Sequence, residues 1–428
     1  MTSKNRDDEA FVWAWLPGET EPVVAGRVER DGDRLIFNYG RSYLGREDAI
    51  ALHEPELPLR PGAIAPLTGL SMAGCLRDAA PDAWGRRVII NRKFGHKGKQ
   101  IDVGQLDELT YLLESGSDRI GALDFQRSAT TYAPRGSGAA TLEQLLSVAE
   151  RVESGTPMPP DLDLALFHGS SIGGARPKAI IDDGERKLIA KFSSRDDVLN
   201  VVKGEFVAMR LAAHVGLDVA PVQLVRAAGK DVLLIERFDR ERAGRSWRRK
   251  AMVSALTLFE LDEMMARYAS YEALAEIIRH RFDAPDATLR ELFGRLVFNI
   301  LCGNTDDHAR NHAAFWNGRT LTLTPAYDIC PQSRAGGEAG QAMLITGQNN
   351  MSTLAVCLQA APHFHLGEAE AIELIERQLL AIRDHWPTVR EDAGLTEIER
   401  ALLWRRQLLN PFAFQDAPDV LARFATEE

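Results

Sequence analysis

The sequence LFGRLVFNILCGNTDDHARNH, residues 292–312, joins an apolar pattern to a loop that is almost entirely polar. In its first part apolar residues recur every three or four positions, which predicts a helix that ends at Gly303. The second part, 304–312, holds two aspartates, two histidines, two asparagines and an arginine. A solvated loop would explain this composition, and so would a site where carboxylates and an amide point at a charged ligand. The rest of the sequence decides between the two.

Composition narrows the class of protein. A chain of 428 residues favours two or three domains, and its net charge of −10 gives the whole molecule no electrostatic reason to seek nucleic acid or an anionic membrane. The basic run 240–250 is either a solvated loop or a local contact surface. The four cysteines form no C-x-x-C pair, which argues against a zinc knuckle or a redox motif. The sequence shows no signal peptide and no apolar run of about 18 residues, so we expect a cytoplasmic location.

The first 160 residues predict a strand-rich start followed by helices. Strands are expected at 11–16, 23–30 and 34–40, the last two joined by the turn Asp-Gly-Asp. A helix is expected within 81–94, with a proline near its start. The segment 129–139 is rich in small and turn-forming residues and predicts a domain boundary, after which Thr141 and Gln144 have the spacing of a capping box.

The next part alternates strand-like and helical patterns. LALFH (164–168) predicts a strand or its approach, and it precedes the glycine-bearing loop GSSIGGARPK. Two further strands are expected around a hairpin turn at Asp183-Gly184, and a helix follows that ends at Gly216. VAPVQLV and DVLLIERF again have strand composition, and helical sequence dominates from about residue 253.

The loop after residue 168 is a candidate phosphate-binding loop. Gly169, Gly173 and Gly174 allow backbone to bend sharply or to approach a ligand closely, and no Gly-Lys-Ser/Thr follows as in a Walker A loop. A glycine-rich loop between strands covers nucleotide phosphates in protein kinases, although it is also an ordinary hairpin connection. Lys191, flanked by apolar residues in LIAKF, either reaches phosphate and the helix residue Glu205 or extends to solvent at a strand edge.

The polar loop fits phosphoryl transfer. Asp306 and Asn311 have the spacing D-x-H-x-x-N, and Asp328 follows two strand-like pieces. We expect Asp306 to act as the base or to orient the acceptor, with Asn311 and Asp328 on Mg²⁺, which needs few protein oxygens because it keeps its own waters. For Asp307 a ligand and a solvent-exposed role both remain open. His308 is expected to anchor the loop through its ring nitrogens, in preference to a zinc site with His312.

These motifs together resemble one family. SSIGGARPK, LIAKF, LLIERFDR, NTDDHARNHAAF and LTPAYDIC, in this order, resemble the HipA family of bacterial serine/threonine kinases, the toxins of type II toxin–antitoxin systems. RDAAPDAWGRRVI (77–89) is similar to the family's N-terminal domain. The resemblance implies an α/β fold with a kinase-like core. It predicts a small β-rich N-terminal domain at 1–128, a nucleotide-binding part at 140–238 and a largely helical part with the catalytic loop at 239–428.

The resemblance also implies roles for single residues. Ser171 matches the serine that family members autophosphorylate, with Ser170 beside it as a second candidate, and Lys191 matches the ATP-binding lysine. Lys178 is a further cation for ATP. Glu236 and Phe238 match the hinge that meets adenine, and Asp239 would lie near the ribose. Asp306, Asn311 and Asp328 match the catalytic and metal-binding residues.

ATP and Mg²⁺ are the cofactors that the resemblance implies. The partner is a small HipB-like helix-turn-helix antitoxin, through which the chain would reach operator DNA. The target class is a protein serine, for example on an aminoacyl-tRNA synthetase such as the glutamyl enzyme, with inhibition of translation and growth as the outcome. Two other functions stay open: a small-molecule or lipid kinase, because D-x-H-x-x-N also resembles the loop of phosphoinositide kinases, and a nucleotide-binding pseudokinase that holds a DNA-binding partner.

Overall fold

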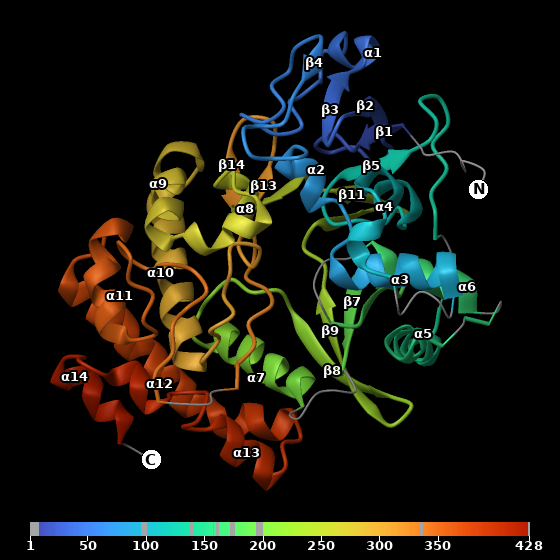
Figure 1. The fold of residues 1–428 in the computed structure, drawn as a ribbon. Coiled ribbons are helices and arrows are strands. Elements are labelled where there is room, and N and C mark those ends of the chain that lie inside the picture. Colours follow the sequence, from blue (N-terminus) through green and yellow to red (C-terminus); the bar gives the residue numbers. More distant parts are fainter. Residues whose placement is uncertain are drawn as a thin grey trace. The chain divides into compact units, whose positions relative to one another are not determined.

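The structure, a computed structural model, describes residues 8–95, 101–136, 140–156, 158–159, 162–171, 176–193, 200–333 and 337–426. The chain divides into two compact units, whose elements Figure 1 labels. The first comprises Met1–Ser194, Val225–Val253 and Phe315–Arg319, and the second comprises Arg195–Leu224, Ser254–Ala314 and Thr320–Glu428. The first unit thus takes in the expected N-terminal domain and most of the expected nucleotide-binding part, and the three domain boundaries stay predictions.

A five-stranded antiparallel sheet begins the first unit, in the order β4-β3-β2-β1-β5. Its strands are β1 (Glu9–Ala14), β2 (Val23–Asp31), β3 (Arg34–Tyr39), β4 (Ala63–Ile64) and β5 (Leu123–Gln126). The three strands predicted from the sequence are confirmed. Gly32, in the turn between β2 and β3, has a φ of 64°, a conformation that costs glycine little. At Gly26 a Cβ atom would lie 2.1 Å from the carbonyl oxygen of Asn38, so the close pairing of β2 and β3 requires glycine.

Among its described residues the first unit has seven short helical segments. They are α1 (Arg41–Leu44), α2 (Gly74–Asp78), α3 (Ala83–Phe94), η2 (Val103–Gln105), α4 (Glu108–Glu114), α5 (Leu142–Ser154) and α6 (Asp163–Ser170). The helix predicted within 81–94 is confirmed as α3. The capping box predicted for Thr141 and Gln144 is confirmed at the start of α5, where each side chain bonds the other residue's backbone N–H.

The strand predicted at 164–168 is wrong, because these residues form helix α6. A short apolar run carries no reliable periodicity, so its neighbours decide its conformation. In this structure α6 packs against α3, α5 and β6, which gives the segment helical partners in place of a ladder of strands. The glycine-bearing loop therefore follows a helix and precedes a strand.

A second sheet has the order β6-β7-β9-β8 and belongs to the first unit except for residues 222–224 at the start of β8, which belong to the second unit. Its strands are β6 (Lys178–Asp182), β7 (Lys187–Phe192), β8 (Val222–Ala227) and β9 (Lys230–Glu236), and the hairpin β10 (Arg240–Ala243) and β11 (Ser246–Arg249) follows. The predicted turn at Asp183-Gly184 joins β6 and β7, with Gly184 at a φ of 86°. One apolar cluster joins Trp84 and Val88 of α3, Leu145 and Val152 of α5, and Ala190, Phe192, Val232 and Leu234 of the sheet. This cluster holds the lysine-bearing strands against two helices.

The second unit is largely helical (Figure 1). Its longer helices are α7 (Val201–His214), α9 (Tyr271–Arg281), α10 (Pro285–Cys302), α12 (Glu368–Asp392), α11 (Leu354–Ala360) and α13 (Glu397–Leu403). Short elements complete it: α8 (Ala255–Leu258), α14 (Asp419–Ala422), the 3₁₀ segments η4 (Glu263–Tyr268), η5 (Ala361–Phe364), η6 (Pro411–Phe414) and η7 (Arg423–Ala425), and strand β14 (Leu321–Leu323). Strands β12 (Met252–Ser254) and β13 (Ala313–Trp316) contain residues of both units.

Helix α10 delivers the polar loop, as the sequence predicts. All its side chains from Leu292 to Cys302 are buried, and Gly303 ends it in the left-handed conformation with a φ of 74°. A Cβ atom at Gly303 would lie 2.6 Å from the carbonyl oxygen of Gln407. Both the left-handed backbone and the lack of space therefore require glycine at this helix end. None of the described helices combines the length and the apolar character needed to cross a membrane.

Candidate functional site

Two lysines of the predicted nucleotide site lie opposite each other in the first unit. Lys178 on β6 is the register partner of Lys191 on β7, so both side chains leave the same face of the sheet. Their exposed fractions are only 7% and 8%. Two positively charged side chains on one face of a sheet attract an anion. The pair therefore suits a phosphate group.

The glycine-bearing loop is described at its two ends. Gly173 and Gly174 lie outside the described residues. Gly169 lies in the last turn of α6, where a Cβ atom would come within 3.2 Å of the Lys178 carbonyl oxygen and 3.3 Å of Trp84 Nε1. Trp84 Nε1 donates a hydrogen bond of 2.9 Å to that same oxygen. Gly169 thus lets α6 approach the start of β6.

Both loop serines are buried. Ser171 is 3% exposed and its hydroxyl donates to the carbonyl oxygen of Asp118 at 3.2 Å. Ser170 Oγ donates to the carbonyl oxygen of Phe167 and accepts from the backbone N–H of Gly116, both at 2.9 Å. A cavity of about 600 Å³ within the first unit is lined by residues that include Ser171, Asp118, Lys187, Arg240 and Arg249. The lining contains both cations and carboxylates, and Lys187 and Arg240 pair with Asp118.

The predicted hinge follows β9. Glu236 pairs with Leu188 of β7, and the next N–H, that of Arg237, donates to the Lys187 carbonyl oxygen at 2.8 Å. The ring of Phe238 lies edge to face with that of Phe315, at 5.9 Å between centroids. Adenine binding by Glu236 and Phe238 stays a prediction.

Asp239 belongs to a buried network of charges. Arg237 Nη2 and Arg240 Nη1 lie 2.8 and 2.9 Å from Asp239 Oδ2, and Gly121 N–H donates to the same oxygen at 2.8 Å. Burial by itself would raise the pKa of the Asp239 carboxyl, but Arg237 and then Arg240 outweigh it and lower that pKa. The carboxylate thus has a structural role that accounts for its position, and its contact with a ribose stays a prediction.

The same two arginines bind Asp118. Arg237 Nη1 and Arg240 Nη2 lie 3.0 and 2.8 Å from Asp118 Oδ1, and Lys187 Nζ lies 3.3 Å from Oδ2. These charges hold the pKa of the Asp118 carboxyl well below its usual range against the opposing effect of burial. Sequence reasoning missed this network, because no local pattern connects Asp118 with residues about 120 positions later. The only signal in the sequence was the charged pair Asp239 and Arg240, shortly after a strand.

The polar loop is described completely within the second unit. Asp306 is exposed, whereas Asn311 is buried and its Nδ2 donates to Asp328 Oδ2 at 3.0 Å. Asn311 Oδ1 accepts from the backbone N–H of His308 at 3.0 Å, which fixes the amide's orientation. Asp328 has a φ of 59°, a strained conformation that Asp tolerates better than most residues. The structure therefore brings Asn311, on the loop that carries Asp306, together with Asp328 from the segment after β14.

Asp307 is not solvent-exposed, and a ligand role for it stays untested. It is buried, accepts a hydrogen bond from the Tyr271 hydroxyl, and lies with Oδ1 3.0 Å from His312 Nε2. Burial, and then the charge of Asp307, raise the pKa of the Tyr271 hydroxyl well above its ordinary value, so this hydroxyl stays a donor. Asp307 is therefore a structural anchor of the loop.

The expectation for His308 needs correction. Its Nδ1 atom is buried and makes no hydrogen bond to any described residue, so it does not anchor the loop through that nitrogen. The histidine that anchors the loop is His312, through Asp307. Adjacent histidines and aspartates cannot be assigned to core or solvent from spacing in an irregular loop, because no period applies there.

Glu205 is buried on α7, in the second unit. Its pairing with Lys191 of the first unit stays a prediction.

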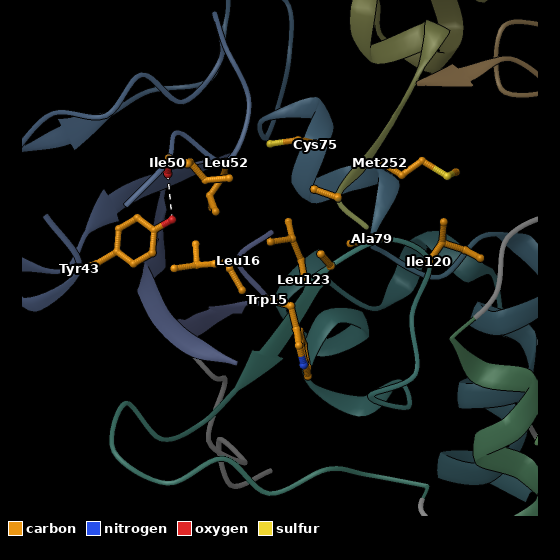
Figure 2. A pocket seen from close by; sticks show the side chains of 14 residues that line it. Trp15, Leu16, Tyr43, Ile50, Leu52, Cys75, Ala79, Ile120, Leu123 and Met252 are labelled. Atoms are coloured by element: carbon orange, nitrogen blue, oxygen red, sulfur yellow. Dashed lines mark hydrogen bonds between the residues drawn. The ribbon is translucent and has the colours of Figure 1, made fainter. Parts of the chain in front are cut away.

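A small apolar cavity near the first sheet is not a ligand site. Figure 2 shows Trp15, Leu16, Leu52, Cys75 and Leu123 among its lining, and Tyr43, whose hydroxyl donates to the Ile50 carbonyl oxygen at 2.8 Å. The cavity volume is about 20 Å³, room for roughly one water molecule.

Comparison with known proteins gives the class and then the family. The solved HipA structure from the HipA, HipB and operator DNA complex of the Shewanella oneidensis toxin–antitoxin system aligns with 97% of this chain and 96% of that chain, with a TM-score of 0.65 and 18% sequence identity. This likeness confirms the expected kinase-like α/β fold. The description "HipA-like C-terminal domain" matches residues 170–386, and "HipA N-terminal domain" matches residues 20–126. The chain belongs to the HipA family.

The curated relatives match only part of this chain. The serine/threonine-protein kinase toxin HipA of Shewanella oneidensis is 27% identical over 209 residues, which is 42% of this chain and 47% of the relative. The protein Y4mE of Sinorhizobium fredii is 27% identical over 179 residues, 37% of this chain and 41% of the relative. The match spans about half the length of the curated relatives.

Proposed function

We propose that this chain is a protein kinase that transfers the γ-phosphate of ATP to a serine of a protein target. The observation that carries the proposal is the loop 304–312, which holds the exposed Asp306 and also Asn311, whose side chain bonds Asp328 from a later segment. A positioned carboxylate can accept the proton of an attacking hydroxyl. Family membership and the kinase name of the Shewanella relative support the same reaction.

The donor set of the loop fits Mg²⁺. Asn311 and Asp328 offer amide and carboxylate oxygens, the hard ligands that Mg²⁺ prefers, and the hydrogen bond between their side chains holds them together. Within the described part of the chain no group of three or more His, Cys, Asp or Glu could hold a metal ion, which fits an ion that takes its other ligands from phosphates and water. When bound, Mg²⁺ would neutralise charge on the phosphates of ATP.

The lysine pair supports nucleotide binding. Lys178 and Lys191 are cross-strand partners on one sheet face, where their positive charges would attract a phosphate. We assign Lys191 to the ATP phosphates and Lys178 to a supporting charge. Gly173 and Gly174 would then let the loop backbone approach the same phosphates. Glu236 and Phe238 would receive the adenine, and Asp239 would lie near the ribose.

We assign a helix-turn-helix antitoxin as the partner, by analogy with the Shewanella complex of HipA, HipB and operator DNA. The net charge of −10 supports contact with DNA mainly through such a partner. The target class proposed is an aminoacyl-tRNA synthetase, such as the glutamyl enzyme, so that phosphorylation would stop translation and growth.

Ser171 is the proposed self-inactivation site. Its hydroxyl is buried against the Asp118 carbonyl oxygen, so it must leave this position to be phosphorylated. A phosphate there would add about −1.5 to −2 charges at neutral pH. Its charge would repel the ATP triphosphate and compete for Lys178 and Lys191, and it would also compete with Asp118 for Lys187 and Arg240, which line the same cavity as Ser171. Phosphorylated Ser171 should therefore mark a state with weak ATP affinity.

The test is Asp306→Asn in the full chain. We expect the variant to bind ATP normally but to transfer phosphate roughly 10² to 10⁴ times more slowly, the usual contribution of a positioned base. Labelled ATP reports transfer, and calorimetry reports ATP binding. Transfer at the wild-type rate would refute the assignment, and absence of transfer in the wild type would favour a pseudokinase.

The same two proteins test Ser171. Mass spectrometry should find phosphate on Ser171 in the wild type and not in Asp306→Asn. Equal ATP affinity of the phosphorylated and unphosphorylated forms would remove the inhibitory role of this serine.

A further inference from the structure

Three large apolar side chains lie exposed on the short segment η4 of the second unit. Met264, Met265 and Tyr268 are 83%, 43% and 52% exposed. Among the described residues seven large apolar side chains are exposed, and these three of them lie within the five positions 264–268. Soluble proteins leave such clusters uncovered mainly where another molecule binds.

The chain around η4 is fastened to the loop that carries Asp306. Before η4, at the start of the segment 255–271, the Ala255 N–H donates to the carbonyl oxygen of His312 at 2.8 Å. In η4 itself, Glu263 pairs with Arg310. Directly after η4, the Tyr271 hydroxyl donates to Asp307. Residues 255–271 thus contact the loop 304–312 at three places, so a molecule bound on η4 is held beside the loop.

Charge indicates what kind of molecule fits. Residues 260–268 contain three acidic residues and one basic residue. Arg310 already pairs with Glu263, and the guanidinium of Arg267 lies 4.9 Å from the centre of the Tyr268 ring. Glu260 and Asp262, whose Oδ1 accepts from the Met264 N–H at 2.9 Å, leave this surface with an excess of negative charge that attracts a cation. An apolar group beside a lysine or arginine matches this combination.

We propose that the η4 surface, formed by Met264, Met265, Tyr268, Glu260 and Asp262, is the docking site of the protein substrate. It would bind an apolar side chain that is followed or preceded by Lys or Arg, close to the acceptor serine. Methionine side chains are flexible and polarisable, so they accept apolar groups of different shapes, and a tyrosine adds a rigid contact. This proposal rests on the proposed kinase function and adds the selection of its substrate.

The experiment uses a library of peptides with a fixed serine and varied neighbours. Two readouts are made on the full chain: retention of peptides without ATP, and phosphate transfer from labelled ATP. The variant is Met264→Ser combined with Met265→Ser, and the control is Ile398→Ser on α13, an equally apolar side chain that is 74% exposed. Wild type and control should select peptides with an apolar residue beside Lys or Arg. The double variant should bind these peptides about tenfold more weakly, the effect of losing a moderate contact residue, while its ATP affinity is unchanged.

Three outcomes overturn the docking site. The double variant selects the same peptides with the same affinity as the wild type, or the wild type shows no preference for apolar and basic neighbours. Alternatively, sedimentation shows that the wild type self-associates and that the double variant does not, which would make the surface a contact between two copies of this chain. If peptides are retained as expected but the wild type transfers no phosphate, the kinase proposal fails and the docking surface stands.

Discussion

The hydroxyl of Tyr271 helps to fix the geometry of the loop 304–312. This hydroxyl donates to the buried carboxylate of Asp307, whose other oxygen faces His312. The loop has little regular structure, so side-chain bonds take the place of a backbone ladder. The position of Asp306, the residue directly before Asp307, therefore depends on a tyrosine 35 positions earlier, at the start of α9.

Replacing Tyr271 with Phe should lower the free energy of unfolding by about 1–3 kcal/mol, because a buried carboxylate loses a donor. Phosphate transfer should fall as well, through a looser loop and with unchanged ATP affinity. Tyr268→Phe is the matched control, since its hydroxyl is exposed and should matter by less than about 0.5 kcal/mol. Equal thermal stability of the two variants would show that the Tyr271 bond has no net value.

Asp328 gives a prediction about the metal. Asp328→Ala should weaken nucleotide binding in the presence of Mg²⁺ by on the order of 10- to 100-fold, and should weaken metal-free binding much less. Asp328→Asn separates the charge from the backbone, because Asn tolerates the positive φ at this position and Ala does not. Calorimetry with and without Mg²⁺ measures both effects, and an equal loss under the two conditions would make Asp328 structural.

The sequence predicts Asn311 and Asp328 better than it predicts their neighbours. Both lie at positions that the resemblance to kinases names, and the structure places Asn311 Nδ2 3.0 Å from Asp328 Oδ2, while their binding of Mg²⁺ stays a prediction. Asp307 and His308 carry none, because their burial depends on Tyr271 and on the way the loop folds back. The charges around Asp118 are equally hidden, since their partners lie in distant parts of the chain.

At the level of elements, prediction succeeds where a period or a turn residue is present. The hairpin at Gly184 and the helix end at Gly303 each depend on one glycine with a positive φ, a signal visible in the sequence. The segment 164–168 has neither, and its helical form depends on α3 and α5. Around the glycine-bearing loop, local composition was therefore enough to predict the hairpin, but it was not enough to predict the helix α6.

Helices α7 and α12 meet at a stacked histidine pair, His214 and His385, whose ring centroids lie 3.9 Å apart. Partial burial, then the charges of His385 and Arg210, lower the pKa of His214, and Asp392 opposes them. A base with a lowered pKa binds fewer protons in the folded than in the unfolded chain. This contribution to stability is therefore present above about pH 6.5 and is lost as the pH falls below it.

We expect His385→Gln to reduce the fall in melting temperature between pH 7.5 and pH 5.5. The difference should be at most about 2 °C, because the pair is partly exposed and solvent screens it. His280→Gln is the control, since that histidine lies on the surface beside Glu276. A pH dependence that is the same in His385→Gln and wild type would contradict the role of the pair.

For the whole molecule, the network of Asp118, Asp239, Arg237 and Arg240 joins segments that are distant in the sequence. Both arginine side chains are almost fully buried, so they depend on these two carboxylates. The lowered pKa values of Asp118 and Asp239 mean that their contribution to stability is present above about pH 4 and is lost as the pH falls further.

Asp118→Asn should destabilise the fold by about 2 kcal/mol, less than the loss of a fully buried pair, because Asp118 is 29% exposed and Asp239 remains. The control is Asp182→Asn, which also pairs with Lys187 but is more exposed. Urea unfolding measures both. A loss no larger than that of Asp182→Asn would show that the arginines find compensation elsewhere.

This network has a consequence for fragments of the protein. The match to the family's N-terminal domain ends at residue 126, and the match to its C-terminal domain begins at residue 170. Asp118, in the first match, nevertheless bonds Arg237 and Arg240 in the second. A polypeptide cut in the connection would leave Arg237 and Arg240 without Asp118 in one piece, and Asp118 without its cations in the other. Neither piece should fold well when synthesised alone. Produced together, the pieces should recognise each other through these charges and reconstitute one particle, which makes this connection a rational place to split the chain into a complementing pair.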